Sequence, residues 1–141
     1  RIFVIARLIK DCRTRIQSTT SKLRTLDTLM NLYIGIFLVF VGQIIGWFQL
    51  NAQYTTEWWK DKPIWAAFLL GVPCSIAFWY SWKLIVDETG SAWTARFIGS
   101  SAGLIVFPIL TWFLLGESMF TPKTMICLTL AVIIMLIQLF Y

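Results

Sequence analysis

Four long stretches of this chain contain no charged residue, and each is long enough to cross a lipid bilayer as a helix. They are residues 31–56, 63–82, 97–116 and 124–141, with 26, 20, 20 and 18 residues respectively. A bilayer core about 30 Å thick needs roughly 20 apolar residues in a helix that rises about 1.5 Å per residue. We therefore predict four transmembrane helices.

The composition agrees with a chain that lipid surrounds. Hydrophobic residues make up 58% of the 141 residues and charged residues only 13%, whereas an average soluble domain is about 25% charged. From position 31 onward the charges are confined to three short breaks, which leaves too few polar residues to cover a soluble globule. We expect an all-α, integral membrane four-helix bundle in the plasma (inner) membrane, with the lipid bilayer as its first partner.

The three breaks are short enough to be tight turns, so neighbouring helices should be antiparallel in an up-down-up-down topology. The predicted helices span approximately residues 31–56, 63–86, 90–116 and 122–141. Pro63 and Pro122 stand where the first turns of the second and fourth helices would begin, and there the missing proline N–H costs nothing. Gly90 fits the opening of the third helix.

Residues 1–29 form an N-terminal extension that carries the net charge of the chain. Seven Lys and Arg residues against two acids give it +5, while residues 30–141 are neutral. Two interpretations stay open: residues 2–9 form an amphipathic helix on an anionic membrane surface, or Met30 is the natural start and the extension is a non-native leader. With the extension, the positive-inside rule places both termini in the cytoplasm; without it, neither orientation is preferred.

Several kinds of chemistry are disfavoured by the residues that the chain lacks. It has no histidine, its three cysteines show no metal-binding spacing, and no carboxylate lies inside an uncharged stretch. Histidine is the commonest metal ligand and general base, and a proton-coupled carrier usually needs an ionisable group at the depth of its substrate. We therefore expect no enzyme activity, no catalytic residue, no metal, no cofactor and no nucleic-acid partner.

The first predicted helix has a small, polar face opposite a bulky one. At 100° per residue its glycines share one stripe, and Gln43 lies on the edge of that stripe near mid-membrane. Glycines of this kind, here and on the third helix, permit close helix packing. The predicted packing residues are Gly35, Gly42, Gly46, Gly99 and Gly103. Gln43 either forms an interhelical hydrogen bond or contacts a ligand.

The third predicted helix carries Arg96 and Ser100 on one face. Arg96 either extends to the membrane interface or attracts an anion in a water-filled vestibule, with Asp87 and Glu88 as natural partners.

Two kinds of residue lie deep inside the predicted helices. Pro73 and Pro108 should bend the second and third helices, and Trp47 and Trp79 are predicted to be core aromatics.

Four short segments of the chain, taken in their order along the sequence, are typical of a known family of membrane proteins. They are Met-Asn-Leu-Tyr-Ile at 30–34, Gln-Ile-Ile-Gly at 43–46, the stretch 99–103, and Trp-Phe-Leu-Leu-Gly-Glu at 112–117, which leads through Pro122 into the fourth helix. In this order residues 30–141 resemble a whole protomer of the small multidrug resistance family, in the drug/metabolite transporter superfamily. The resemblance implies a homodimer, often with protomers in opposite orientations, that exchanges protons for cationic substrates at a helix-one glutamate. That position reads Gln43 here.

Two functions follow as hypotheses. The first is a dimeric transporter-like protein, similar to small multidrug resistance or EamA proteins, that binds or moves a small solute without the membrane carboxylate. Its predicted substrate-binding residues are Gln43, Trp79, Tyr80, Arg96 and Ser100. The second is a non-transporting membrane accessory or assembly protein, whose contact surface would be the glycine stripes.

Overall fold

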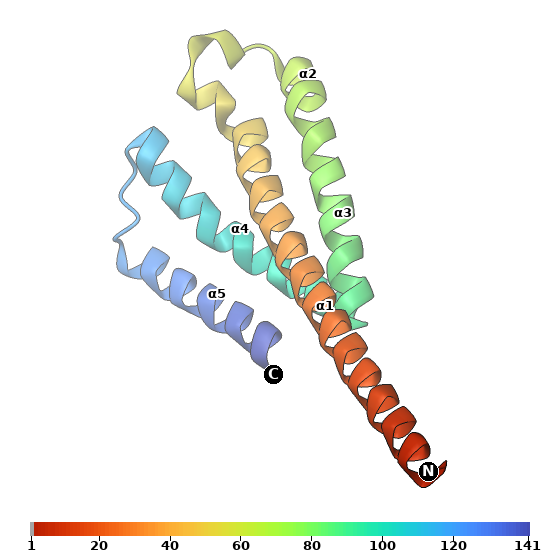
Figure 1. The fold of residues 1–141 in the computed structure, drawn as a ribbon. Helices are drawn as coiled ribbons and strands as arrows, with labels where there is room; N and C mark the ends of the chain where they lie inside the picture. The colour runs from red at the N-terminus through yellow and green to blue at the C-terminus, as the bar shows by residue number, and fades with distance from the viewer. Residues whose placement is uncertain (1) are drawn as a thin grey trace.

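The computed structural model describes the backbone of residues 2–141 and the side chains of residue 17 and residues 19–141. This part of the chain is all-α, and four of its helical segments are the main elements of a bundle, as predicted (Figure 1). The helices are α1 (Ile2–Thr55), α2 (Pro63–Ala66), α3 (Val72–Thr89), α4 (Ala92–Leu115) and α5 (Pro122–Phe140); the 3-10 turn η1 (Glu57–Trp59) precedes α2, and the π-helical turn η2 (Ala67–Gly71) joins α2 to α3.

Four helical segments in the described part of the chain are long and apolar enough to cross a membrane. They are Thr19–Thr55, Pro63–Thr89, Ala92–Leu115 and Pro122–Phe140. Large apolar side chains such as Phe68, Phe113 and Leu130 are more than half exposed on the outside of the protomer. Soluble proteins rarely expose apolar patches of this extent, whereas lipid solvates them. The chain is therefore a multi-pass membrane protein.

The core lies where α1, α3 and α4 meet. α1 and α3 lie side by side and antiparallel, α4 runs at an angle along them, and α5 packs mainly on α4 (Figure 1). The buried cluster consists of Val39, Ile85, Ala95, Ile98 and Ala102, with Met135 and Leu139 of α5 packed against it. Because most core residues on α4 are small, the helices approach closely.

Two glycines end helices in the left-handed region of the backbone, which glycine adopts without steric cost. Gly90 has φ 68° and Gly116 has φ 72°. The prediction that Gly90 opens the third helix is wrong. Gly90 instead ends α3 at the residue after Thr89. Ser91 caps α4 instead, since its Oγ accepts a hydrogen bond from the Thr94 N–H at 3.3 Å.

The prolines have different local effects. Pro63 and Pro122 are the first residues of α2 and α5, as predicted. Pro73 is the second residue of α3, shortly after η2, and a widened π turn is one way to accommodate the hydrogen bond that proline cannot donate. Pro108 lies inside α4, which stays α-helical on both sides of it.

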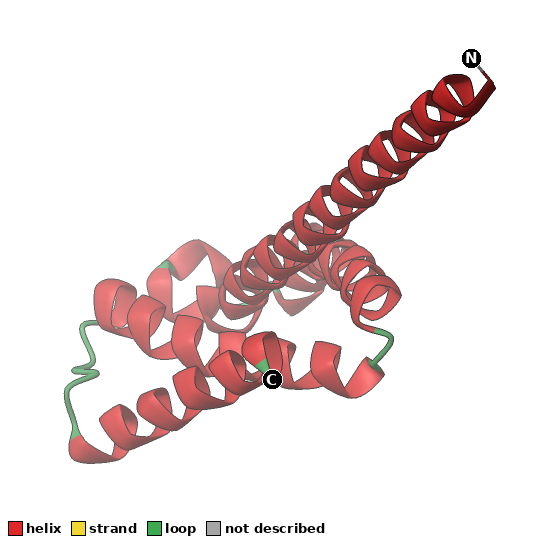
Figure 2. Cartoon of the chain, turned by 60° about the horizontal axis from the view of Figure 1, so that its bottom comes forward, coloured by secondary structure: helices red, strands yellow, loops and turns green. Residues whose placement is uncertain are grey.

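The N-terminal extension and the first span form one uninterrupted helix. α1 has 54 residues, and its N-terminal part projects well beyond the other helices (Figure 2). Residues 2–34 contain neither glycine nor proline, so no helix-breaking residue separates the basic extension from the apolar span. Residues 2–9 are therefore the start of α1, and their placement on a membrane surface stays a prediction.

Candidate functional site

Glycines on α1 allow α3 to approach closely. An added Cβ would lie 2.9 Å from the nearest α3 atom at Gly35, 3.0 Å at Gly42 and 3.4 Å at Gly46. Two α3 side chains bind the backbone that these glycines leave accessible. Ser81 Oγ donates to the Gly35 carbonyl at 2.8 Å, and Cys74 Sγ donates to the Gly42 carbonyl at 3.3 Å. The pair α1–α3 thus forms a tightly packed wall.

Gln43 connects α1 to α4 near the middle of the first span. Its Nε2 donates to the Gly99 carbonyl at 2.8 Å, and the side chain is half-buried. The amide also lies against Gly103, where an added Cβ would be 3.0 Å from Gln43 Oε1. Gly99 has a different role, because an added Cβ there would meet nothing within 4 Å. The Gln43 amide is therefore held in one orientation by α4.

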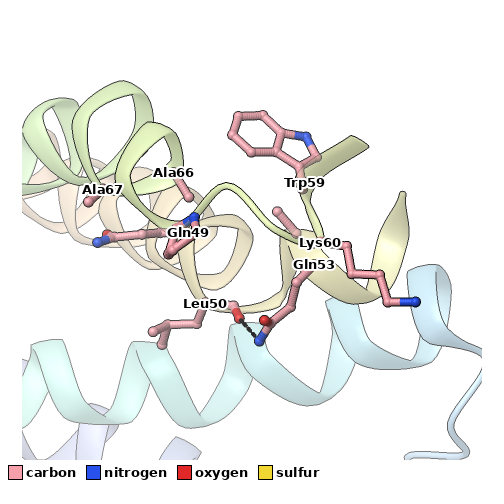
Figure 3. A pocket seen from close by; sticks show the side chains of 9 residues that line it. Gln49, Leu50, Gln53, Trp59, Lys60, Ala66 and Ala67 are labelled. Atoms are coloured by element: carbon pink, nitrogen blue, oxygen red, sulfur yellow. Dashed lines mark hydrogen bonds between the residues drawn. The ribbon is translucent and has the colours of Figure 1, made fainter. Parts of the chain in front are cut away.

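Two adjoining cavities lie along α1 beside Gln43. The inner cavity, of about 270 Å³, is lined by Gln43, Gly46, Trp47, Gln49, Leu50, Phe78, Gly103 and Phe107. The outer cavity, of about 300 Å³, is lined by Gln49, Leu50, Ala52, Gln53, Trp59, Lys60, Pro63, Ala66 and Ala67 (Figure 3). They share Gln49 and Leu50, and together they form the glutamine cleft. Each is near the lower size limit of small-molecule sites.

The polar lining of the glutamine cleft is mostly uncharged. Among the described residues, Lys60 at the η1 end is the only charged one that lines either cavity, and the other long polar side chains are the amides of Gln43, Gln49 and Gln53. Gln53 Nε2 donates to the Leu50 carbonyl at 3.3 Å (Figure 3). A side-chain amide both donates and accepts hydrogen bonds. This lining, with several aromatic rings, suits a neutral solute that has hydrogen-bonding groups.

Trp47 joins α1 to α4 in the wall of the cleft. Only 3% of its surface is exposed, and its Nε1 donates to Thr111 Oγ1 at 3.1 Å. The ring also meets Phe48 edge-on, with centroids 5.2 Å apart. The prediction that Trp47 is a core aromatic is confirmed.

This indole hydrogen bond yields a stability prediction. Thr111→Val should lower the free energy of unfolding by about 1–3 kcal/mol, because it leaves the buried indole N–H without an acceptor. In a Trp47→Phe background the same substitution should cost almost nothing, since the donor is already absent. Unfolding of the parent chain and the three variants in detergent micelles, followed by far-UV circular dichroism, gives both values. Equal losses in the two backgrounds would show that the bond contributes nothing.

Of the residues predicted to bind solute, only Gln43 lines the glutamine cleft. Trp79 and Tyr80 are 61% and 53% exposed on α3, with their ring centroids 5.0 Å apart. Trp79 lines a separate, open groove of about 550 Å³ with Ser75, Phe78, Trp82 and Lys83. The prediction that Trp79 is a core aromatic is wrong, because α3 turns this side away from α1.

Arg96 and Ser100 are also exposed, and neither lines the cleft. Within the described part of the chain, Arg96 forms no ion pair with Asp87 or Glu88. Glu88 instead accepts a hydrogen bond at 2.7 Å from Nδ2 of Asn31, which joins the end of α3 to α1. The described contacts therefore do not pair Arg96 with either of the two acids that the anion-binding interpretation named as its partners.

Gln49 and Gln53 line the cleft although the sequence did not single them out as binding residues. Both residues lie on the same helical stripe as the α1 glycines. This position was the signal that could have identified them as lining residues, because the stripe faces α3 and η2. The Gln49 amide lies against Gly71 of η2, where an added Cβ would be 3.0 Å from its Nε2. Pro73 predicted a local distortion of this helix, but the sequence does not show that the η2 turn would complete this contact.

The chain matches no known protein family, no curated protein and no solved structure. The described residues also contain no group of three or more His, Cys, Asp or Glu side chains that could hold a metal ion. The resemblance to the small multidrug resistance family therefore stays a prediction, and the glutamine cleft is the main guide to function.

Proposed function

We propose that this protein is a transporter-type protein of the inner membrane that binds and moves a small, neutral, hydrogen-bonding solute through the glutamine cleft. The observation that supports this most is that the two cavities share part of their lining. They share Gln49 and Leu50, and they extend from the η1 turn to Gln43 near mid-span. A polar path to this depth is costly in a membrane helix bundle and is typical of solute pathways.

The charges in the cleft favour a neutral solute. Lys60 would repel a cation at the outer cavity, and no carboxylate of the described side chains lines either cavity to compensate this charge. Gln43 has no titratable proton, so it cannot exchange protons as the helix-one glutamate of the resembled family does. A neutral solute needs no counter-charge when it leaves water. The proposed transport is therefore not coupled to protons through this position.

The accessory or assembly role is the second candidate, and fewer features of the structure support it. Its contact surface was expected to be the glycine stripes. Gly35, Gly42 and Gly46 face α3 within the protomer, so this stripe is not available to another protein. Gly99 has open space beside it, but its carbonyl already accepts the Gln43 hydrogen bond.

Purified protein in liposomes tests the proposed function against a panel of neutral polar solutes, cations and anions. We expect binding or flux of a neutral solute, weakened about two- to tenfold by Gln43→Leu, the equivalent of one neutral hydrogen bond. Tyr80→Leu removes an exposed hydroxyl outside the cleft and should change neither. Folded protein that binds and moves no solute of any class would contradict transport and favour the accessory role.

A further inference from the structure

An uncovered apolar stripe on α1 begins in the part that projects from the bundle and continues beside the bundle. Leu23, Leu26, Met30, Tyr33 and Phe37 are all more than half exposed. Successive members are three, four, three and four residues apart. This is the spacing of the a and d positions of a heptad repeat, which keeps apolar residues on one side of a helix that pairs with another.

The same spacing continues to the start of the chain. Counted back from Leu23, the a and d positions are residues 19, 16, 12, 9, 5 and 2, which are Thr, Ile, Cys, Ile, Ile and Ile. The α1 backbone is helical over all of them. A repeat sustained over three to four heptads or more indicates a coiled coil. Isoleucine at a, as at positions 2, 9 and 16, combined with leucine at d, as at position 26, is the pattern that favours two parallel strands.

We propose that residues 2–33 pair with the same segment of a second copy of this chain as a parallel two-stranded coiled coil. In such a pair, each g residue faces the e residue five positions later on the partner helix. Lys22 at g then faces Asp27 at e of the second copy, which is a favourable pair of charges. The other g-to-e pairs, 8 with 13, 15 with 20 and 29 with 34, bring no like charges together.

The direction of α1 favours a protein partner over the lipid surface. The extension follows the axis of the first span and projects away from the other helices (Figure 2). A helix that lies on the membrane would need a sharp bend where it leaves the bilayer. Residues 2–34 contain no glycine or proline at which such a bend would form.

This pairing fixes the relative orientation of the two copies. Copies inserted in opposite directions would carry their extensions on opposite sides of the bilayer, where they cannot meet. The coiled coil therefore requires a parallel homodimer, and the seven basic residues of 1–29 place both extensions in the cytoplasm. This differs from the opposite orientations that the family resemblance implies, and it is independent of what the glutamine cleft binds.

Disulfide crosslinking of the full chain in membranes tests the pairing. Cys12→Ser and Cys127→Ser remove two thiols, while Cys74 is kept because it is buried and bonds to Gly42. Leu26→Cys, at a d position, places two thiols within disulfide reach across the seam, so mild oxidation should yield mainly covalent dimer. The matched variant Ser21→Cys, at an f position on the opposite face, should yield at least about tenfold less.

Met30→Cys provides a second position on the stripe, at a, and should also crosslink. Equal crosslinking at positions 21 and 26 would overturn the proposal, because it would mean that contact is non-specific. Folded protein with no crosslinking at either 26 or 30 would overturn it as well. Shielding of these two positions from a water-soluble maleimide in a monomer would show that the stripe lies on lipid, which also contradicts the pairing.

Discussion

Gly35→Ala should lower the free energy of unfolding of the bundle by about 1–3 kcal/mol, the usual cost of an extra methyl group in a packed contact. The added Cβ would lie 2.9 Å from Ile85 Cγ1 and 3.2 Å from Leu84 Cβ. Ile85 is fully buried, so its side chain has no free space into which it can move. The helices would have to separate, and the Ser81 hydrogen bond to the Gly35 carbonyl would lengthen.

Gly99→Ala is the matched control, since it adds the same methyl group to another membrane helix. An added Cβ at Gly99 meets nothing within 4 Å. Alanine is the better helix former by up to about 1 kcal/mol, so this variant should be as stable as the parent chain or more stable. Unfolding in mixed micelles with increasing denaturing detergent measures both variants. Equal losses at positions 35 and 99 would contradict the close α1–α3 contact.

Gly103→Val should abolish solute binding by the glutamine cleft, with a loss of more than about tenfold in affinity, because it fills the inner cavity from α4. An added Cβ at this position would lie 3.0 Å from Gln43 Oε1 and 3.2 Å from its Cδ. The branched valine would therefore displace the Gln43 amide and occupy part of a cavity of about 270 Å³.

Gly99→Val controls for a β-branched residue on the same helix, one turn away. Gly99 does not line either cavity, so this variant should keep its affinity within about twofold of the parent chain. Equilibrium binding in detergent, with circular dichroism to verify folding, compares the two. Retained binding in folded Gly103→Val protein would mean that the solute site lies outside the glutamine cleft.

The transmembrane helices were predictable because hydrophobic length is a local property of the sequence. The uncharged stretches at 31–56 and 124–141 each end one residue after the C-terminal end of α1 and α5, although α1 begins far earlier, at Ile2. The α3 end at Thr89 was harder to locate. The apolar character of this helix is lost at three charged residues, Lys83, Asp87 and Glu88. Charged residues are nevertheless compatible with a helix that continues beyond the membrane core, so they do not show where the helix ends.

The candidate site was only partly predictable because it depends on which helix faces meet. Gln43 stood out as a polar residue near mid-span, and the structure places it in the cleft. Trp79 and Tyr80 were predicted to bind solute, but α3 directs Cys74 and Ser81 toward α1. Helical spacing then places the two aromatic rings on other faces of α3. The α1 glycines marked the covered face of that helix, but α3 has no comparable stripe to show which of its faces meets α1.

Four segments of the chain should be stable only when lipid surrounds them, and extraction of the membranes tests this directly. Membranes from cells that express the chain can be washed with alkaline carbonate and then solubilised with detergent, with the protein followed by immunoblot. The protein should stay with the carbonate-washed membranes and leave them only in detergent. Recovery of a folded monomer in the aqueous fraction, before any detergent is added, would contradict the bundle and everything proposed for its cleft.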